Sequence, residues 1–189
     1  MYIYICEIRD SFLYVNKKLN RLVSKERIKK IAKLNLSKDK EISFLSELLL
    51  KLIIAKQFRI NPKNINFQKT TNGKPYIPYI KDCHFSISHS DNLIVIVIDT
   101  QEVGVDAEKI NPLQANPLDF FSKTQLDVFN HLSKSSKLLY FYQLWSLKES
   151  YIKLLNLTSD MPFNEIDLNL INSFTFLYKG YVISVAHKR

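Results

Sequence analysis

The architecture of this chain is set by residues 93–109, which read Leu-Ile-Val-Ile-Val-Ile-Asp-Thr-Gln-Glu-Val-Gly-Val-Asp-Ala-Glu-Lys. The first part, Leu93–Asp99, is an apolar run with the length and β-branched composition of a strand. A short turn follows, and Val103–Glu108 predicts another strand. Because alternate residues of a strand point to the same face, Asp106 and Glu108 are expected to project side by side.

The patterns on either side of this stretch repeat in the same order. The sequence predicts strands at 1–8, 65–69, 85–89, 93–99, 103–108, 173–179 and 181–186, and helices at 25–36, 41–58, 118–132 and 136–155. In the helix 41–58, one apolar stripe is expected to face the core, formed by Leu45, Leu48, Leu49, Leu52 and Ile53. The order strand, helices, strands occurs twice. It predicts an α+β fold of two similar halves, 1–102 and 103–189, rather than a doubly wound sheet.

Composition narrows the class of partner. The chain has 189 residues and a net charge of +9, which favours a polyanionic partner: a nucleotide, a nucleic acid, an acidic protein or an anionic membrane surface. Cys6 and Cys83 belong to no paired-cysteine motif and are typical of reduced cytosolic thiols. The N-terminal run lacks the basic region of a signal peptide, and no apolar run approaches the ~20 residues of a membrane span. We therefore expect a cytoplasmic protein without a membrane partner.

A third acid, Glu149, lies in the helical stretch 144–153, Leu-Trp-Ser-Leu-Lys-Glu-Ser-Tyr-Ile-Lys. Three-and-four spacing places it on one face with Trp145, Lys148 and Ile152, and Lys153 follows one turn later. Taken alone, this helix could carry only a surface Glu–Lys pair over a buried Trp. Together with Asp106 and Glu108 it predicts a Mg²⁺ site, because neighbouring carboxylates repel each other unless a cation lies between them. The lysines would then serve substrate phosphates, which indicates phosphoryl-type chemistry.

Another cluster is the run Phe-Ser-Ile-Ser-His-Ser at 85–90. His89, at the strand end beside Ser88, is a candidate donor to a phosphate; the alternative is a histidine held by the turn. Lys74 follows the turn signal Asn72-Gly73 and is a second candidate phosphate contact, or else a solvated turn lysine.

These runs resemble the 4′-phosphopantetheinyl transferase family, surfactin-synthetase-activating type. The similarity rests on Asn-Gly-Lys-Pro (72–75) with Phe-Ser-Ile-Ser-His-Ser, on Val-Gly-Val-Asp-Ala-Glu-Lys (103–109), and on Phe-Phe-Ser-Lys-Thr (120–124) followed by the stretch 144–153. The resemblance implies two α/β halves around a pseudo-twofold axis, with the active site between them. It also implies Mg²⁺-dependent transfer of 4′-phosphopantetheine from coenzyme A to a serine of an acyl or peptidyl carrier protein, releasing adenosine 3′,5′-bisphosphate.

The resemblance also implies roles for individual residues. Metal binding would fall to Asp106, Glu108 and Glu149, with Glu149 or a metal-held water accepting the serine proton and Lys153 stabilising the leaving group. The coenzyme A phosphates would be held by a larger set, namely Lys74, Ser88, His89, Lys148, Lys153, Arg27 and Lys30. Where relatives place an arginine near Ile42 this chain has none, and Lys38 or Lys40 is the candidate replacement. Gln125 replaces the family's usual Glu, and we expect it to alter local packing or carrier docking.

Two other functions would use parts of the same pattern. A Mg²⁺-dependent phosphatase or nuclease would use the same three carboxylates, but it would not need the Ser-His and Gly-Lys-Pro motifs, which suit a bulky, fixed nucleotide. A basic nucleic-acid-binding protein would account for the charge of +9 but not for acids at the two most patterned sites. The carrier, its pathway and the oligomeric state do not follow from the residues, although two halves in one chain make a monomer sufficient.

Overall fold

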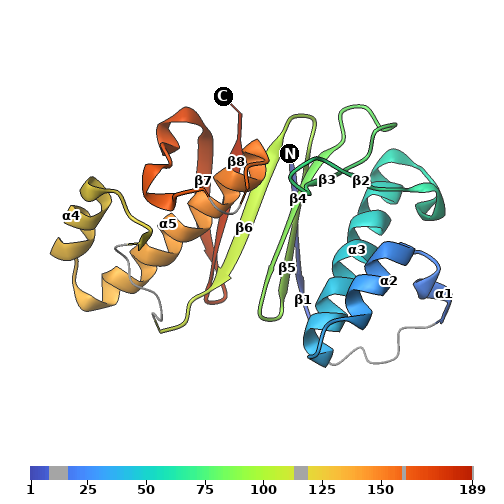
Figure 1. Cartoon of the computed structure of the whole chain (residues 1–189), viewed down its shortest axis with the longest axis horizontal. Coiled ribbons are helices and arrows are strands. Elements are labelled where there is room, and N and C mark those ends of the chain that lie inside the picture. The colour runs from blue at the N-terminus through green and yellow to red at the C-terminus, as the bar shows by residue number, and fades with distance from the viewer. Residues whose placement is uncertain (9–16, 113–118, 159–160, 189) are drawn as a thin grey trace.

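Two three-stranded antiparallel sheets and their helices follow one another along the chain, and β2 and β3 form a further two-stranded sheet (Figure 1). The computed structural model describes residues 1–8, 17–112, 119–158 and 161–188. The first half contains β1 (Tyr2–Glu7), α1 (Lys17–Asn20), α2 (Lys25–Ala32), α3 (Ser37–Phe58), β2 (Gln68–Lys69), β3 (Pro75–Tyr76), β4 (His84–Ser90) and β5 (Leu93–Asp99). The second contains β6 (Val103–Lys109), α4 (Lys123–His131), α5 (Lys134–Leu155), β7 (Asn172–Tyr178) and β8 (Tyr181–His187).

The two larger sheets have the same strand order. In the first, β5 lies between β1 and β4, and in the second, β8 lies between β6 and β7. Every neighbouring pair is antiparallel, and in each sheet the first strand of the half pairs with its last. Helices and antiparallel sheets in one chain confirm the α+β class.

The strand β5 is buried on both faces, which explains its unbroken apolar sequence. Ile94, Ile96 and Ile98 pack in a cluster with residues of α3. On the other face, Leu93, Val95 and Val97 pack against side chains of β6 and β8. The sheets therefore lie back to back, with α3 outside one and α5 outside the other, as Figure 1 shows.

Serine side chains join the two sheets where β4 and β6 run side by side. Ser86 Oγ accepts a hydrogen bond from the Val105 backbone N–H at 3.0 Å. Ser90 Oγ accepts from the Lys109 N–H, also at 3.0 Å. Every second residue from 86 to 90 is a serine, so β4 presents a row of hydroxyls to β6. The hydroxyls of Ser86 and Ser90 accept hydrogen bonds from β6 backbone N–H groups, which in one continuous sheet would bond to the backbone of the neighbouring strand.

Gly104 allows α5 to approach β6 closely. A Cβ at this position would lie 2.0 Å from the Ser150 carbonyl oxygen and 2.5 Å from the Leu154 backbone nitrogen. Both atoms belong to the backbone of α5 and cannot move away as a flexible side chain could. Glycine at 104 therefore sets the distance between the helix and the strand that carry the predicted acids.

Lys148 lies inside the second half rather than at a surface. Its side chain is fully buried, and Nζ donates to the carbonyl oxygens of Phe120 (2.7 Å) and Phe163 (2.9 Å) and to Gln125 Oε1 (2.6 Å). This ammonium ties α5 to α4 and to the segments before α4 and before β7. Lys148 therefore does not lie where it could make the contact with a phosphate of coenzyme A that the sequence predicts. Burial lowers the pKa of Lys148 to about 8.

Several element bounds differ from expectation. The strand expected at 65–69 is reduced to β2, because a 3₁₀ turn occupies Pro62–Asn64 and the backbone N–H of Ile65 closes it. The helix expected at 41–58 begins earlier, at Ser37, and the one expected at 118–132 spans Lys123–His131. Residue 118 lies outside the described part of the chain. Within the described ranges, no helix combines the length and apolarity needed to cross a bilayer.

We expect Gly104→Ala to lower the free energy of unfolding by about 3 kcal/mol or more, because the new methyl group forces β6 and α5 apart. Gly73→Ala is the matched control: its φ is +87° but nothing lies within 4 Å of the added Cβ, so only backbone strain of about 1 kcal/mol is expected. Urea denaturation measures both. Equal losses in the two variants would contradict close helix–strand packing at 104.

The buried Lys148 predicts a pH dependence of stability. The pKa of Lys148 is about 8 in the folded protein and has its ordinary value of 10.5 in the unfolded chain. Between pH 8 and pH 10.5, the unfolded chain therefore holds a proton on Lys148 that the folded protein lacks. Stability should therefore rise with pH above 8. Between pH 7.5 and 9.5 the wild type should gain on the order of 2 kcal/mol over Lys148→Met. All other titrating groups are the same in wild type and in Lys148→Met, so a difference between their stability–pH curves reports on Lys148 alone. Parallel curves for the two proteins would refute the lowered pKa of Lys148.

Candidate active site

The face of β6 that meets α5 carries both predicted acids. Val105 and Ala107 point into the core between the sheets, so the alternate residues Asp106 and Glu108 point toward the helix. On α5, Trp145 reaches Glu108 and Lys153 reaches Asp106. Glu149 lies midway between Trp145 and Lys153 in the sequence, four residues from each. Side chains four apart share one helix face, which explains how three acids from two distant segments gather.

Asp106 is the most buried of the three. Only 5% of its side chain is exposed. Its Oδ1 accepts hydrogen bonds from Ser88 Oγ at 2.9 Å and from Lys153 Nζ at 2.6 Å. Its Oδ2 is buried and has no hydrogen-bond partner among the described residues. A buried carboxylate oxygen without a partner is costly, which makes this atom a suitable ligand for a cation.

Glu108 is held from both sides. Its Oε2 accepts from Ser90 Oγ and its Oε1 from the indole Nε1 of Trp145, each at 3.2 Å. Burial, reinforced by the negative charge of Asp106, raises the pKa of Glu108 to about 7.

Glu149 shares this electrostatic environment. Burial raises its pKa, the charge of Asp106 raises it further, and the charge of Lys153 lowers it. Asp106 therefore acts on both glutamates through poorly solvated space, and a divalent cation among the three carboxyl groups would relieve this repulsion. Among the residues that the structure describes, no three such groups are already close enough to enclose an ion. The acids fit a metal in number, chemistry and in the unpaired Oδ2.

His89 marks a positive region beside the acids. The residue is exposed, and its pKa is lowered first by desolvation and then by the charges of Lys153, Arg27 and Lys30. Lys153 comes from α5, and Arg27 and Lys30 come from α2, so the fold brings three positive charges to the side of His89 at the end of β4. Such a cluster favours an anion.

Arg27 is fixed in place on α2. Its Nε donates to Glu47 Oε2 at 3.2 Å and its Nη1 to Ser43 Oγ at 3.3 Å. Arg27 and Lys30 line a cavity of about 250 Å³ together with Lys51 and Lys69. Ser43 thus lies beside Arg27 in the part of α3 where the relatives' arginine was expected. Lys38 instead pairs with Asp91.

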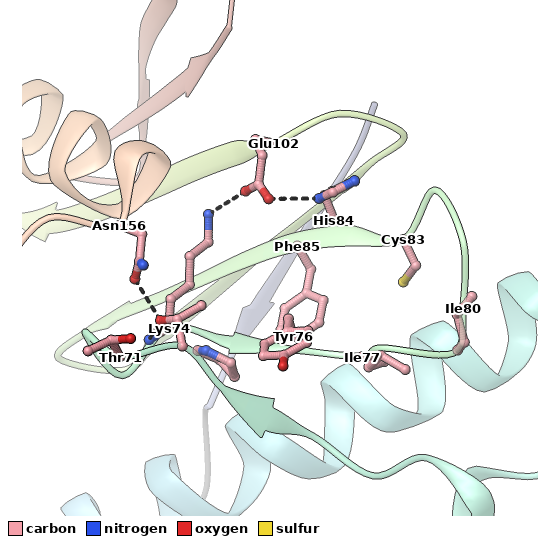
Figure 2. Close-up of a pocket in the computed structure, with 12 residues that line it drawn as sticks. Thr71, Lys74, Tyr76, Ile77, Ile80, Cys83, His84, Phe85, Glu102 and Asn156 are labelled. Atoms are coloured by element: carbon pink, nitrogen blue, oxygen red, sulfur yellow. Dashed lines mark hydrogen bonds and ion pairs between the residues drawn. The ribbon is translucent and has the colours of Figure 1, made fainter.

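Lys74 lies differently from expectation, as Figure 2 shows. Its ammonium donates to Glu102 Oε2 at 2.8 Å, to the Val103 carbonyl at 3.2 Å and to the Leu154 carbonyl at 3.4 Å. Glu102 is also 3.0 Å from His84 Nδ1. Lys74, Glu102 and His84 line a cavity of about 390 Å³, and Asp106 is not among the residues that line it. In this structure Lys74 therefore fastens the 70–75 loop to the second half.

The loop has further links to α5. Thr70 Oγ1 donates to Asn156 Oδ1 at 2.8 Å, and Asn72 Nδ2 donates to the Asn156 carbonyl at 2.6 Å. Asn156 ends α5 in a left-handed conformation, which exposes these acceptors. Between loop and helix lies a cavity of about 260 Å³ lined by Gly73, Lys74 and Lys153 among others. Lys153 therefore borders a cavity that the loop also lines.

The structure brings together most of the predicted residues and adds others. Asp106, Glu108, Glu149, Lys153 and Ser88 meet at one place, and His89, Arg27 and Lys30 lie on its positive side. Lys148 and the ammonium of Lys74 lie elsewhere. Ser90 and Trp145 were not predicted as partners of Glu108. The alternation of serines in 86–90 and the four-residue step from Trp145 to Glu149 are the signals that could have found them.

Comparison with known families covers nearly the whole chain. Residues 15–101 match the family model described as 4′-phosphopantetheinyl transferase, N-terminal. Residues 102–182 match the model of the 4′-phosphopantetheinyl transferase superfamily.

Individual relatives agree with the family matches. 4′-Phosphopantetheinyl transferase Sfp of Bacillus subtilis (strain 168) is 31% identical over 156 residues, which is 82% of this chain and 70% of that protein. 4′-Phosphopantetheinyl transferase gsp of Aneurinibacillus migulanus is 32% identical over 162 residues, 85% and 68% of the two chains. The mouse L-aminoadipate-semialdehyde dehydrogenase-phosphopantetheinyl transferase is 26% identical over 170 residues, 80% and 55%. The chain therefore belongs to the 4′-phosphopantetheinyl transferase family, of the type that includes Sfp and gsp, and is a transferase.

Proposed function

We propose that the protein transfers 4′-phosphopantetheine from coenzyme A to a serine of an apo acyl or peptidyl carrier protein, with Mg²⁺, releasing adenosine 3′,5′-bisphosphate. The observation that carries this proposal is the meeting of three acids on β6 and α5 with the positive cluster of α2 and the end of β4. A substrate with a diphosphate and a further phosphate would span both regions. Family membership supplies the group that is transferred.

The proposed site lies between two halves, 1–102 and 103–189, related by a pseudo-twofold axis. The shared strand order of the two sheets supports this relation. Hydrogen bonds from Ser88 and Ser90 of the first half to Asp106 and Glu108 of the second hold the site across the boundary. Both sides of the site come from one chain, so a monomer is sufficient.

We assign the acids to metal binding. Asp106, Glu108 and Glu149 would hold Mg²⁺, which supplies charge neutralisation for the diphosphate when bound. Glu149 is also the preferred acceptor of the serine proton, because among the described residues its carboxylate accepts no hydrogen bond and lies on the helix face that meets Asp106.

We assign the basic residues to phosphate binding. Arg27, Lys30 and His89 would hold the phosphate on the ribose side of coenzyme A, at the cavity that Arg27 and Lys30 line. Lys153 would neutralise the leaving phosphate from the diphosphate side, while Ser88 would orient Asp106 and lie next to the substrate. Lys74 would shape the cofactor cleft through the loop that it fastens, rather than bind phosphate itself.

The partners follow from charge and family. A net charge of +9 favours an acidic carrier protein over nucleic acid, given three acids at the centre of the site. We place the reaction in the cytoplasm, where both coenzyme A and apo carriers would be available.

The activity is tested on a panel of apo carrier proteins from fatty-acid, polyketide and peptide synthesis, incubated with Mg²⁺ and coenzyme A. We expect at least one carrier to gain the mass of phosphopantetheine in intact-mass spectrometry. A hydrolase using the same acids would instead consume coenzyme A without modifying a carrier. No mass gain on any carrier would count against the transferase.

Metal ligation is tested with Asp106→Asn and Glu149→Gln, each of which keeps the shape of its side chain. We expect transfer to fall at least about a hundredfold in both, because charge stabilisation at the diphosphate is lost. Asp127→Asn, at an exposed acid of α4, is the matched control and should keep wild-type turnover. Thermal unfolding verifies that all three variants are folded. Full turnover in either site variant would move the metal elsewhere.

A further inference from the structure

Lys153 occupies the place where a cation is needed. Its ammonium lies 2.6 Å from Asp106 Oδ1 and 3.1 Å from Ser88 Oγ. Its charge also lowers the raised pKa values of both Glu108 and Glu149. One side chain thus acts on all three acids that were assigned to metal binding.

This single charge leaves the acids incompletely neutralised. Asp106 Oδ2 remains buried without a partner although Lys153 contacts the other oxygen of the same carboxylate. A divalent ion carries the charge and the coordination number that one ammonium lacks.

An ammonium on Asp106 and a divalent ion on the same carboxylate would repel each other strongly. Like charges a few ångström apart in a poorly solvated site interact by several times the thermal energy. Lys153 has room to withdraw, because its side chain is 30% exposed and lines the cavity of about 260 Å³ beside Gly73 and Lys74. Asp106 is 5% exposed and lies on β6, which pairs with β8 along its whole length, so it has no such freedom.

We propose that Lys153 is an internal counter-ion of the metal site: it holds Asp106 in the metal-free protein and moves to the substrate diphosphate when the divalent ion enters. This inference rests on the proposed function of the same acids. Lys153 then lowers the metal affinity of the free protein. It also couples the two ligands, because a bound diphosphate gives the displaced ammonium a new partner.

The test is Mg²⁺ binding to the whole protein without substrate, at pH 8.5, where Glu108 with its pKa of about 7 is ionised. Trp145 is the one tryptophan of the chain and donates to Glu108, so its fluorescence reports on this site directly. Isothermal titration calorimetry provides the second readout. We expect Lys153→Met and Lys153→Gln to bind Mg²⁺ about tenfold more tightly than wild type.

Two controls separate local from general charge effects. Lys153→Arg keeps the charge and should bind no more tightly than wild type. Lys179→Met removes one positive charge at the far turn between β7 and β8, where Lys179 pairs with Glu7, and should also match wild type. Repeating the titrations with saturating coenzyme A should tighten Mg²⁺ binding by a larger factor in wild type than in Lys153→Met.

The outcomes distinguish this inference from the function on which it rests. If wild type modifies a carrier and binds Mg²⁺, but Lys153→Met and Lys153→Gln bind it equally or more weakly, the counter-ion role is overturned and the transferase stands. If wild type shows neither saturable Mg²⁺ binding nor carrier modification, both are overturned. Tighter binding in Lys179→Met as well would also overturn a local role for Lys153.

Discussion

Repulsion among three carboxyl groups in one poorly solvated space is the constraint on which the rest of this structure depends. Asp106 contributes to the raised pKa of both Glu108 and Glu149, so no one of these acids can be considered alone. The surrounding protein opposes the repulsion with a lysine, two serines and an indole, each aimed at a carboxylate oxygen. Acids that are held together against their mutual repulsion, with strongly shifted pKa values, are typical of functional sites.

The fold maintains this arrangement through contacts between its two sheets. Apolar side chains of β5 and β8 form the inner core, and the hydroxyls of β4 bond to the backbone and to the acids of β6. Gly104 lets the backbone of α5 approach the strand that carries Asp106. The acids therefore sit on two rigid elements that packing holds at one fixed separation, which is the requirement for a preorganised charged site.

Sequence periodicity predicted those parts of the site that depend on a single strand or a single helix. Alternation in a strand placed Asp106 and Glu108 on one face, and the helix pattern identified the region of Glu149 and Lys153. It could not decide the direction of Lys148, because three-and-four spacing allows either neighbouring face, and the interior carbonyls of Phe120 and Phe163 come from distant segments. The ion pair of Lys74 was not predicted for the same reason, since Glu102 reaches this lysine only through tertiary folding.

The helix α3 shows a similar limit. One apolar stripe was predicted, but Leu52 is 39% exposed, while Ile42, Leu50 and Ile54 are buried. This helix packs on two neighbours: Leu50 and Ile54 face the sheet, whereas Phe44 and Leu48 pack against Val23 before α2. A helix with two buried faces has no single stripe, so its orientation depends on partners that the local pattern does not contain.

The most direct test of a metal site between β6 and α5 is a crystal structure with coenzyme A and Mn²⁺, located by anomalous scattering. Our account predicts an anomalous peak within ligand distance of Asp106 Oδ2, about 2.2 Å, with Glu108 and Glu149 beside it. Lys153 Nζ should then lie on the diphosphate and no longer on Asp106. An anomalous peak away from these three acids, or coenzyme A bound on a surface that does not include them, would contradict it.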